Sequence, residues 1–135
     1  MPELTISPVT GGQLVTKLTN NQMRDAVNRR QCFANTNATV YATNGSNLYT
    51  VYTWNNPDTV HSHGALYPLY LYDYETRTWF GNETKLSVTA QRHKTQTRPD
   101  GYIDWCSTPY LLSIIYHGSY AAHCAQAVTR EGSVA

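Results

Sequence analysis

The stretch from Thr39 to Phe80 alternates β-type runs with turn signals, which restricts the folds open to this chain. Tyr, Val, Thr and Trp dominate Leu48–Trp54, and a second aromatic run follows at Leu66–Tyr74. Such composition is typical of strands. The dipeptide Asn44-Gly45 separates Leu48–Trp54 from a preceding β-type run and is a strong hairpin signal. The sequence therefore predicts an antiparallel β-meander of three to five strands.

Helical patterns flank this region on both sides. Thr19-x-x-Gln22 has the form of a capping box, and apolar residues at helical spacing follow it, which predicts a helix over Asn20–Gln31. After the meander, Thr89 can cap a helix over Ala90–Gln96, and Thr108-Pro109 starts another. The predicted fold class is α+β, with an N-terminal helix, the meander and one to three C-terminal helices.

Length and composition favour one domain. The chain has 135 residues and a net charge of +1, and 14% of its residues are charged, against about 25% in an average protein. We expect a loose N-terminal arm over 1–17, a single α+β domain over 18–128 and a frayed tail over 129–135. No apolar run is long enough for a membrane span and no secretory signal is visible, so a cytoplasmic location is expected. Three cysteines without a C-x-x-C pair predict reduced thiols.

A basic segment, Lys85–Arg98, is the first candidate for a binding site. It carries a local charge of +4 and no acid, in a chain that is nearly neutral overall. Guanidinium and ammonium groups, hydroxyls and a helix N-terminus all bind phosphate. The predicted ligand contacts from this segment are Thr89, Arg92, His93, Lys94 and Arg98, and Arg29 joins them if the first helix packs beside the sheet. The alternative is an ordinary solvated helix face.

Aromatic residues crowd the segment between Tyr67 and Phe80. Tyr72, Trp79 and Phe80 are the candidates for stacking on a nucleotide base. Alternation along a strand places Tyr70 and Tyr72 on one face, together with Tyr74. That face is either an exposed binding surface or part of the core, and the sequence leaves both open.

Histidine and cysteine patterns give no catalytic or metal signature. His61-Ser62-His63 lacks further ligands at a zinc-site spacing, and no local pattern supports pairing of Cys106 or Cys32 with His93 as a nucleophile and base. We expect no catalytic residue, no metal and no cofactor, and therefore a protein that is not an enzyme. A nucleotide hydrolase is the enzyme alternative.

One segment resembles a known group of proteins. Trp79-Phe80-Gly81-Asn82, followed by Ser87-Val88-Thr89 and then His93, is similar to a pattern in small uncharacterised proteins of phages and other prokaryotic mobile elements. The resemblance covers about Leu18–Pro99. It implies a phage-type origin and a small α+β domain, and it transfers no activity.

These observations favour a binding protein over an enzyme. The leading hypothesis is a phage-type accessory protein that counteracts host defence by sequestering a phosphate-bearing nucleotide signal, as a homo-oligomer in the host cytoplasm. The first alternative is an inhibitor that binds a host defence effector protein, in the manner of anti-CRISPR proteins. Direct nucleic-acid binding is the further alternative, although the near-zero net charge disfavours it. No membrane partner is expected.

Overall fold

The computed structural model describes residues 3–6, 14–36, 39–55, 65–85 and 87–125. The elements follow in the order β1 (Glu3–Ile6), β2 (Leu14–Leu18), a 3₁₀ helix (Asn20–Gln22), α1 (Met23–Asn28), β3 (Phe33–Asn35), β4 (Val40–Asn44), β5 (Leu48–Asn55), β6 (Ala65–Asp73), β7 (Thr78–Asn82), α2 (Val88–Thr97), β8 (Ile103–Cys106) and α3 (Thr108–His117). A further helical segment covers 120–125.

Eight strands of the described residues form a single sheet, in which the spatial order equals the sequence order. Neighbouring strands are antiparallel except for the pairs β2–β3 and β7–β8, which are parallel. The predicted antiparallel meander of three to five strands is therefore wrong, because the sheet is larger and mixed. The broader α+β class agrees with the structure.

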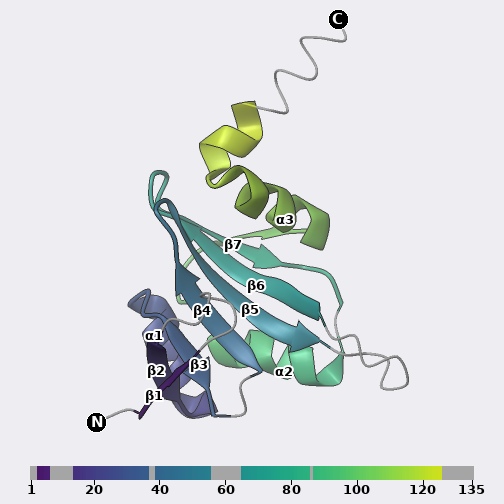
Figure 1. The fold of residues 1–135 in the computed structure, drawn as a ribbon. Helices are drawn as coiled ribbons and strands as arrows, with labels where there is room; N and C mark the ends of the chain where they lie inside the picture. Colours follow the sequence, from purple (N-terminus) through teal and green to yellow (C-terminus); the bar gives the residue numbers. More distant parts are fainter. Residues whose placement is uncertain (1–2, 7–13, 37–38, 56–64, 86, 126–135) are drawn as a thin grey trace, which may run out of the picture.

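Two helical crossovers explain the layering of the molecule. α1 lies in the connection from β2 to β3, and α2 lies in the connection from β7 to β8. Because β2 and β7 run in the same direction and both crossovers step the same way across the sheet, right-handed connections place both helices on one face. Figure 1 shows α1 and α2 together on one side of the sheet and α3 on the other.

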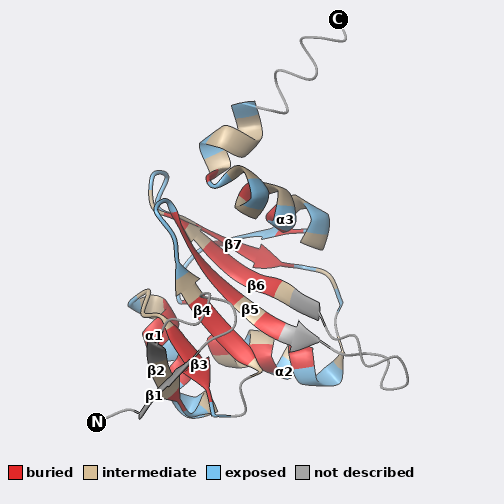
Figure 2. Cartoon of the chain, in the orientation of Figure 1, coloured by how far each residue is buried: buried red, intermediate tan, exposed pale blue. Residues whose placement is uncertain are grey.

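Each face of the sheet contributes to a separate apolar core. Tyr49, Val51 and Trp79 belong to the cluster that also contains Met23 and Val27 of α1. On the opposite face, the buried side chains pack against α3; this cluster comprises Leu48, Leu71, Phe80, Cys106, Leu111 and Ile114. Figure 2 shows the buried residues concentrated in the central strands between the two helical layers.

The first helix is shorter than the predicted span Asn20–Gln31. It ends because Arg30 adopts a left-handed backbone conformation with φ of 53°. The Arg30 amide donates to the Val27 carbonyl, and the Gln31 amide donates to the Ala26 carbonyl at 2.8 Å. This pair of hydrogen bonds is the Schellman arrangement, in which glycine is the usual left-handed residue, so the sequence carries no visible stop signal at Arg30.

The later helices begin at serine caps. The Ser87 hydroxyl accepts a hydrogen bond from the Ala90 amide, so Ser87 caps α2 and the predicted cap, Thr89, lies inside the first turn. Ser107 caps α3 in the same way, with proline in the first turn. Gly118 ends α3 at a φ of 86°, as its position in the sequence predicts.

Within the predicted N-terminal arm, 1–17, the described residues belong to β1 and to β2, which continues to Leu18. β1 is the outer strand at one edge and pairs with β2, which pairs with β3. The predicted frayed tail, 129–135, lies outside the described residues. Within those that are described, no helix has both the length and the apolar character needed to cross a bilayer.

Candidate functional site

Trp105 on the edge strand β8 is the centre of a cationic and aromatic cluster. Its side chain faces α2 and stays 38% exposed. The Lys94 ammonium nitrogen and the Arg98 guanidinium carbon each lie 5.5 Å from the centroid of the indole ring. At this distance the negative face of the ring attracts a cation. The sheet edge therefore presents a partly open aromatic ring with two positive charges beside it.

Contacts with β6 and β7 hold this arrangement in place. The Tyr70 ring meets the Trp105 ring edge-on at 6.1 Å between centroids, and the Tyr70 hydroxyl donates to the Lys94 carbonyl at 2.8 Å. The Lys94 ammonium donates to the Asn82 carbonyl at 2.9 Å. Trp105 stands opposite Gly81 in the β7–β8 pair. Both the ring and one of its cations are thus fixed before any ligand arrives.

A hollow of about 320 Å³ adjoins the cluster between α1 and the α2–β8 connection. Its lining residues are Arg24, Arg98, Pro99, Asp100 and Gly101. The Arg24 guanidinium donates to the Thr95 carbonyl at 3.1 Å, which draws α1 against the end of α2. The Asp100 carboxylate accepts from the Asn28 amide at 3.2 Å. Two arginines thus line the hollow together with one carboxylate that already accepts a hydrogen bond.

Electrostatic effects on neighbouring groups agree with this geometry. Burial raises the pKa of Tyr70, and Arg98 and Arg24 both oppose that rise. Both guanidinium groups therefore act on the same hydroxyl. Burial also lowers the pKa of Lys94. An anion that entered the hollow would be attracted by the two arginines that line it.

A second cation–aromatic contact lies on the same face of the sheet. The Arg30 guanidinium sits 4.7 Å from the centroid of the Tyr72 ring. Tyr72 in turn packs against Trp79 at 5.0 Å between ring centroids. Trp79 is buried and Tyr72 is half-buried against the same core cluster, so both rings contribute to packing on this face. Tyr70 is buried as well, so the predicted row of tyrosines is mainly core.

The sequence-predicted ligand contacts are only partly brought together. Lys94 and Arg98 meet at Trp105, whereas Arg92, two residues before Lys94, lies about 200° from it around the α2 axis. Thr89 is exposed in the first turn of α2. Arg29 is exposed at the end of α1, where it pairs with Asp25 at 2.7 Å.

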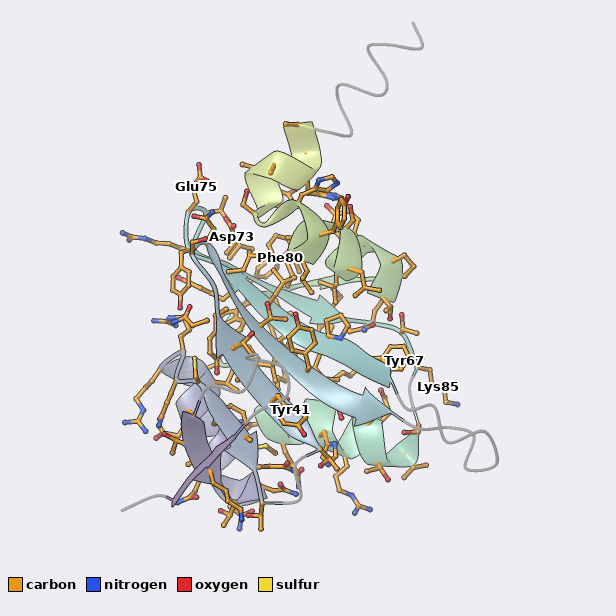
Figure 3. The ribbon with its side chains drawn as sticks, in the orientation of Figure 1. Tyr41, Tyr67, Asp73, Glu75, Phe80 and Lys85 are labelled. Carbon is orange, nitrogen blue, oxygen red and sulfur yellow. The ribbon has the colours of Figure 1, made fainter. Side chains whose placement is uncertain are left out.

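His93 and Phe80 lie away from the cluster. His93 is buried, and its Nδ1 lies 2.9 Å from the Thr53 hydroxyl. Phe80 is on the opposite face of the sheet, where its ring stacks on Tyr120 at 4.9 Å; Figure 3 shows it on the α3 side. Consecutive strand residues point to opposite faces, so Trp79 and Phe80 cannot serve one site.

Arg24, Tyr70 and Trp105 form part of the candidate site, although the sequence analysis assigned them no ligand contact. The sequence contains one indication of the strand that carries Trp105. It is the short alternation Ile103-Asp104-Trp105, which follows the Pro99-Asp100-Gly101 turn. Its meaning depends on parallel pairing with β7, which local patterns do not reveal.

Metal ligands and nucleophiles do not gather at this cluster. No group of three or more His, Cys, Asp or Glu side chains that could hold a metal occurs among the described residues. His61 and His63 lie outside them. On the other side of the molecule, the Ser113 hydroxyl lies 2.8 Å from Nδ1 of His123. That pair lies between α3 and the helical segment 120–125, remote from the basic hollow.

Comparison of the chain with protein-family models, with curated protein sequences and with solved structures finds no match. The resemblance to proteins of phages and other mobile elements therefore stays a prediction.

Proposed function

We propose that the protein binds a phosphate-bearing nucleotide at the Trp105 cluster and acts without catalysis. The observation that carries the proposal is the placement of Lys94 and Arg98 beside a partly exposed indole. An aromatic ring offers a stacking surface to a base, and neighbouring guanidinium groups bind phosphate through paired hydrogen bonds.

Each residue has a distinct role in this proposal. Arg24 and Arg98 bind the phosphate from two sides of the hollow, because both line it. Lys94 adds a fixed positive charge, since the Asn82 carbonyl already orients its ammonium group. The exposed part of Trp105 contacts the base. A role against host defence would follow from sequestration of a nucleotide signal, and it stays a prediction.

Native mass spectrometry with a panel of cyclic and ADP-ribose-type nucleotides tests this proposal. A mass increment that is released unaltered on denaturation supports binding without turnover, and the same spectrum gives the oligomeric state. Arg98→Ala and Trp105→Ala should each abolish the increment, whereas Arg77→Ala, which removes an exposed charge in the β6–β7 turn, should retain it. A wild-type protein without any increment would contradict the proposal, and a converted nucleotide would indicate a hydrolase.

The alternative of an inhibitor that binds a host protein has its own supporting observation. Tyr116 is 85% exposed on α3, and Leu112 on the same helix is also exposed. Exposed apolar and aromatic side chains favour protein contacts. A stable complex in a pull-down from host lysate that Tyr116→Ser abolishes, without any nucleotide increment, would favour this alternative.

A further inference from the structure

The charges of this nearly neutral protein are divided unequally between its two helical layers. α1 and α2, with the residues that directly follow each helix, carry six cations and two carboxylates, a net charge of +4 against +1 for the whole chain. The cations are Arg24, Arg29, Arg30, Arg92, Lys94 and Arg98. We call this surface the basic helical layer.

The opposite layer carries no comparable charge. Residues 107–125, which include α3 and the helical segment after it, contain no Lys, Arg, Asp or Glu. The net charge of the whole chain is near zero, but the positive charges are concentrated on one side of the molecule. The electrostatic potential over the basic helical layer is therefore more positive than the net charge of the chain indicates. This removes the argument from net charge against a polyanionic partner.

The two carboxylates of the basic helical layer are already engaged. Asp25 pairs with Arg29 at 2.7 Å, and Asp100 accepts from Asn28. Four of the six cations are exposed to solvent, namely Arg24, Arg29, Arg92 and Arg98. Because Arg29 shares its charge with Asp25, the charges most open to a partner at the surface are those of Arg24, Arg92 and Arg98.

The cations of the basic helical layer are spread over a longer surface than one bound nucleotide would contact. Arg24 and Arg29 are separated by about 7.5 Å along α1, since each residue of a helix rises about 1.5 Å. Arg92 on α2 and Arg98 at its end add further exposed charges, and α2 lies directly beside α1 through the Arg24–Thr95 hydrogen bond. Arg92 points away from Lys94 around the α2 axis, so a ligand that reached it from Trp105 would have to cross the outer face of α2. A ligand that repeats its negative charge along a chain would meet these groups in succession.

The aromatic side chains next to this layer favour a nucleic-acid strand over an acidic peptide as the ligand. Trp105 is partly exposed, and Tyr102, just before β8, is 80% exposed. Unpaired bases stack on such rings, whereas an acidic peptide gains no equivalent contact. Bases inside a duplex are already stacked on each other, so the rings favour a single strand.

From this juxtaposition we propose that the ligand of the Trp105 cluster is a segment of single-stranded nucleic acid, whose backbone continues across the basic helical layer. The inference rests on the proposed function, because one base and its phosphate occupy the Trp105 cluster. Arg29 and Arg92 then contact phosphates further along the strand, outside the hollow.

Fluorescence anisotropy with labelled oligothymidylates of about 4 to about 16 nucleotides tests the inference. Affinity should rise with length, and binding should weaken with salt. Each neutralised phosphate adds about −0.7 to the slope of log K against log salt concentration for a single strand. Arg24, Lys94 and Arg98 alone would give a slope of about −2, so the longer oligonucleotides should give a steeper one.

Matched variants separate the layer from the hollow. The double variant Arg29→Gln, Arg92→Gln should reduce the magnitude of the slope by about 1.4 for long oligonucleotides and leave mononucleotide binding unchanged. Arg77→Gln removes one exposed cation from the β6–β7 turn and should change neither.

The outcomes distinguish this inference from the function on which it rests. Mononucleotide binding that does not strengthen with length would overturn the inference and leave the proposed function intact. Binding of neither probe would overturn both. Oligonucleotide binding that Arg98→Ala and Trp105→Ala leave intact would overturn the assignment of the cluster. Equal displacement of the oligonucleotide by poly-glutamate of similar length would show an acidic-peptide surface and contradict the nucleic-acid assignment.

Discussion

Gly81 and Trp105 face each other across the parallel strands β7 and β8, and the indole ring fills the space that a side chain at residue 81 would need. A Cβ at Gly81 would lie 2.8 Å and 2.9 Å from two ring carbons of Trp105, and 2.7 Å from a methyl carbon of Ile103. The position of the candidate stacking ring therefore depends on the absence of a side chain on the neighbouring strand.

Gly81→Ala should destabilise the protein by about 1–3 kcal/mol, the usual cost of an overpacked contact. It should also shift the tryptophan emission, because the ring has to move toward solvent. Gly45→Ala is the matched control, since a Cβ there approaches only the Leu48 carbonyl oxygen, at 3.4 Å. Urea denaturation followed by fluorescence measures both effects, and equal midpoints for the two variants would contradict the packing argument.

Asn82→Ala should destabilise the protein by about 1–3 kcal/mol because buried polar groups lose their partners. The Asn82 amide donates to the Pro68 carbonyl at 2.8 Å and to the Thr108 hydroxyl at 2.9 Å, and its oxygen accepts from the Thr84 amide. Asn47→Ala, at an exposed turn position, should change stability little. Chemical denaturation compares the two, and a neutral Asn82→Ala would count against this network.

Tyr49→Phe should cost about 1 kcal/mol, the typical net value of one hydrogen bond. The Tyr49 hydroxyl donates to the Gln31 carbonyl at 2.6 Å, which ties β5 to the end of α1. Burial raises the pKa of this hydroxyl, so it remains a donor throughout the accessible pH range. Tyr116→Phe is the same chemical change at an exposed position and should leave the denaturation midpoint unaltered.

Acidification should destabilise the protein through His93. Burial lowers the pKa of His93, with a smaller contribution from Arg92. The unfolded chain then binds more protons below the ordinary histidine pKa of about 6.5, so this part of the stability is present above that value and is lost as the pH falls toward the folded-state pKa. Denaturation midpoints between about pH 7.5 and about pH 5.5 should fall for the wild type and fall less for His93→Gln.

The pH dependence of stability also has to be measured for a variant of His123. The pKa of His123 is also lowered, by burial and by His117, so His123 adds to the acid sensitivity. His123→Gln should remove a separate part of the pH dependence. A wild-type midpoint that does not change over this range would contradict both histidine predictions.

Cys106 should resist alkylation in the folded protein near neutral pH. Burial, followed by the charges of Asp104 and Glu83, raises the pKa of its thiol to about 11, and the thiolate is the reactive form. Mass spectrometry after iodoacetamide treatment should find Cys106 modified only in urea. Rapid modification without denaturant would show that β8 detaches from the sheet.

The central part of the fold could be predicted from local sequence signals. Strong turn dipeptides and aromatic runs mark β4 to β7, and the structure places strands there. β3 and β8 have three and four residues, too few for a reliable alternation pattern. Both are joined to a parallel neighbour across a helix, so their pairing is not local. The Arg30 helix end also escaped prediction, because glycine normally occupies that position.

Of the residues in the candidate site, only the cations of the basic segment that contains α2 could be predicted from the sequence. The uncompensated positive charge pointed to Lys94 and Arg98, which do lie beside an aromatic ring. The ring itself belongs to β8, and the third cation belongs to α1. Neither could be assigned without the crossover that brings β8 next to β7. An excess of charge can be recognised within one sequence segment. A site built from α1, α2 and β8 can be recognised only when the topology that brings the three elements together is known.

The two parallel pairs also impose an order on folding. The hairpins β4–β5 and β6–β7 join neighbours through short turns, and such local contacts form early because little chain entropy is lost in closing them. β8 can dock on β7 only after the chain has passed through α2. We therefore expect the central sheet to form before Trp105 is in place, so the proposed ligand site would be completed only when β8 docks on β7.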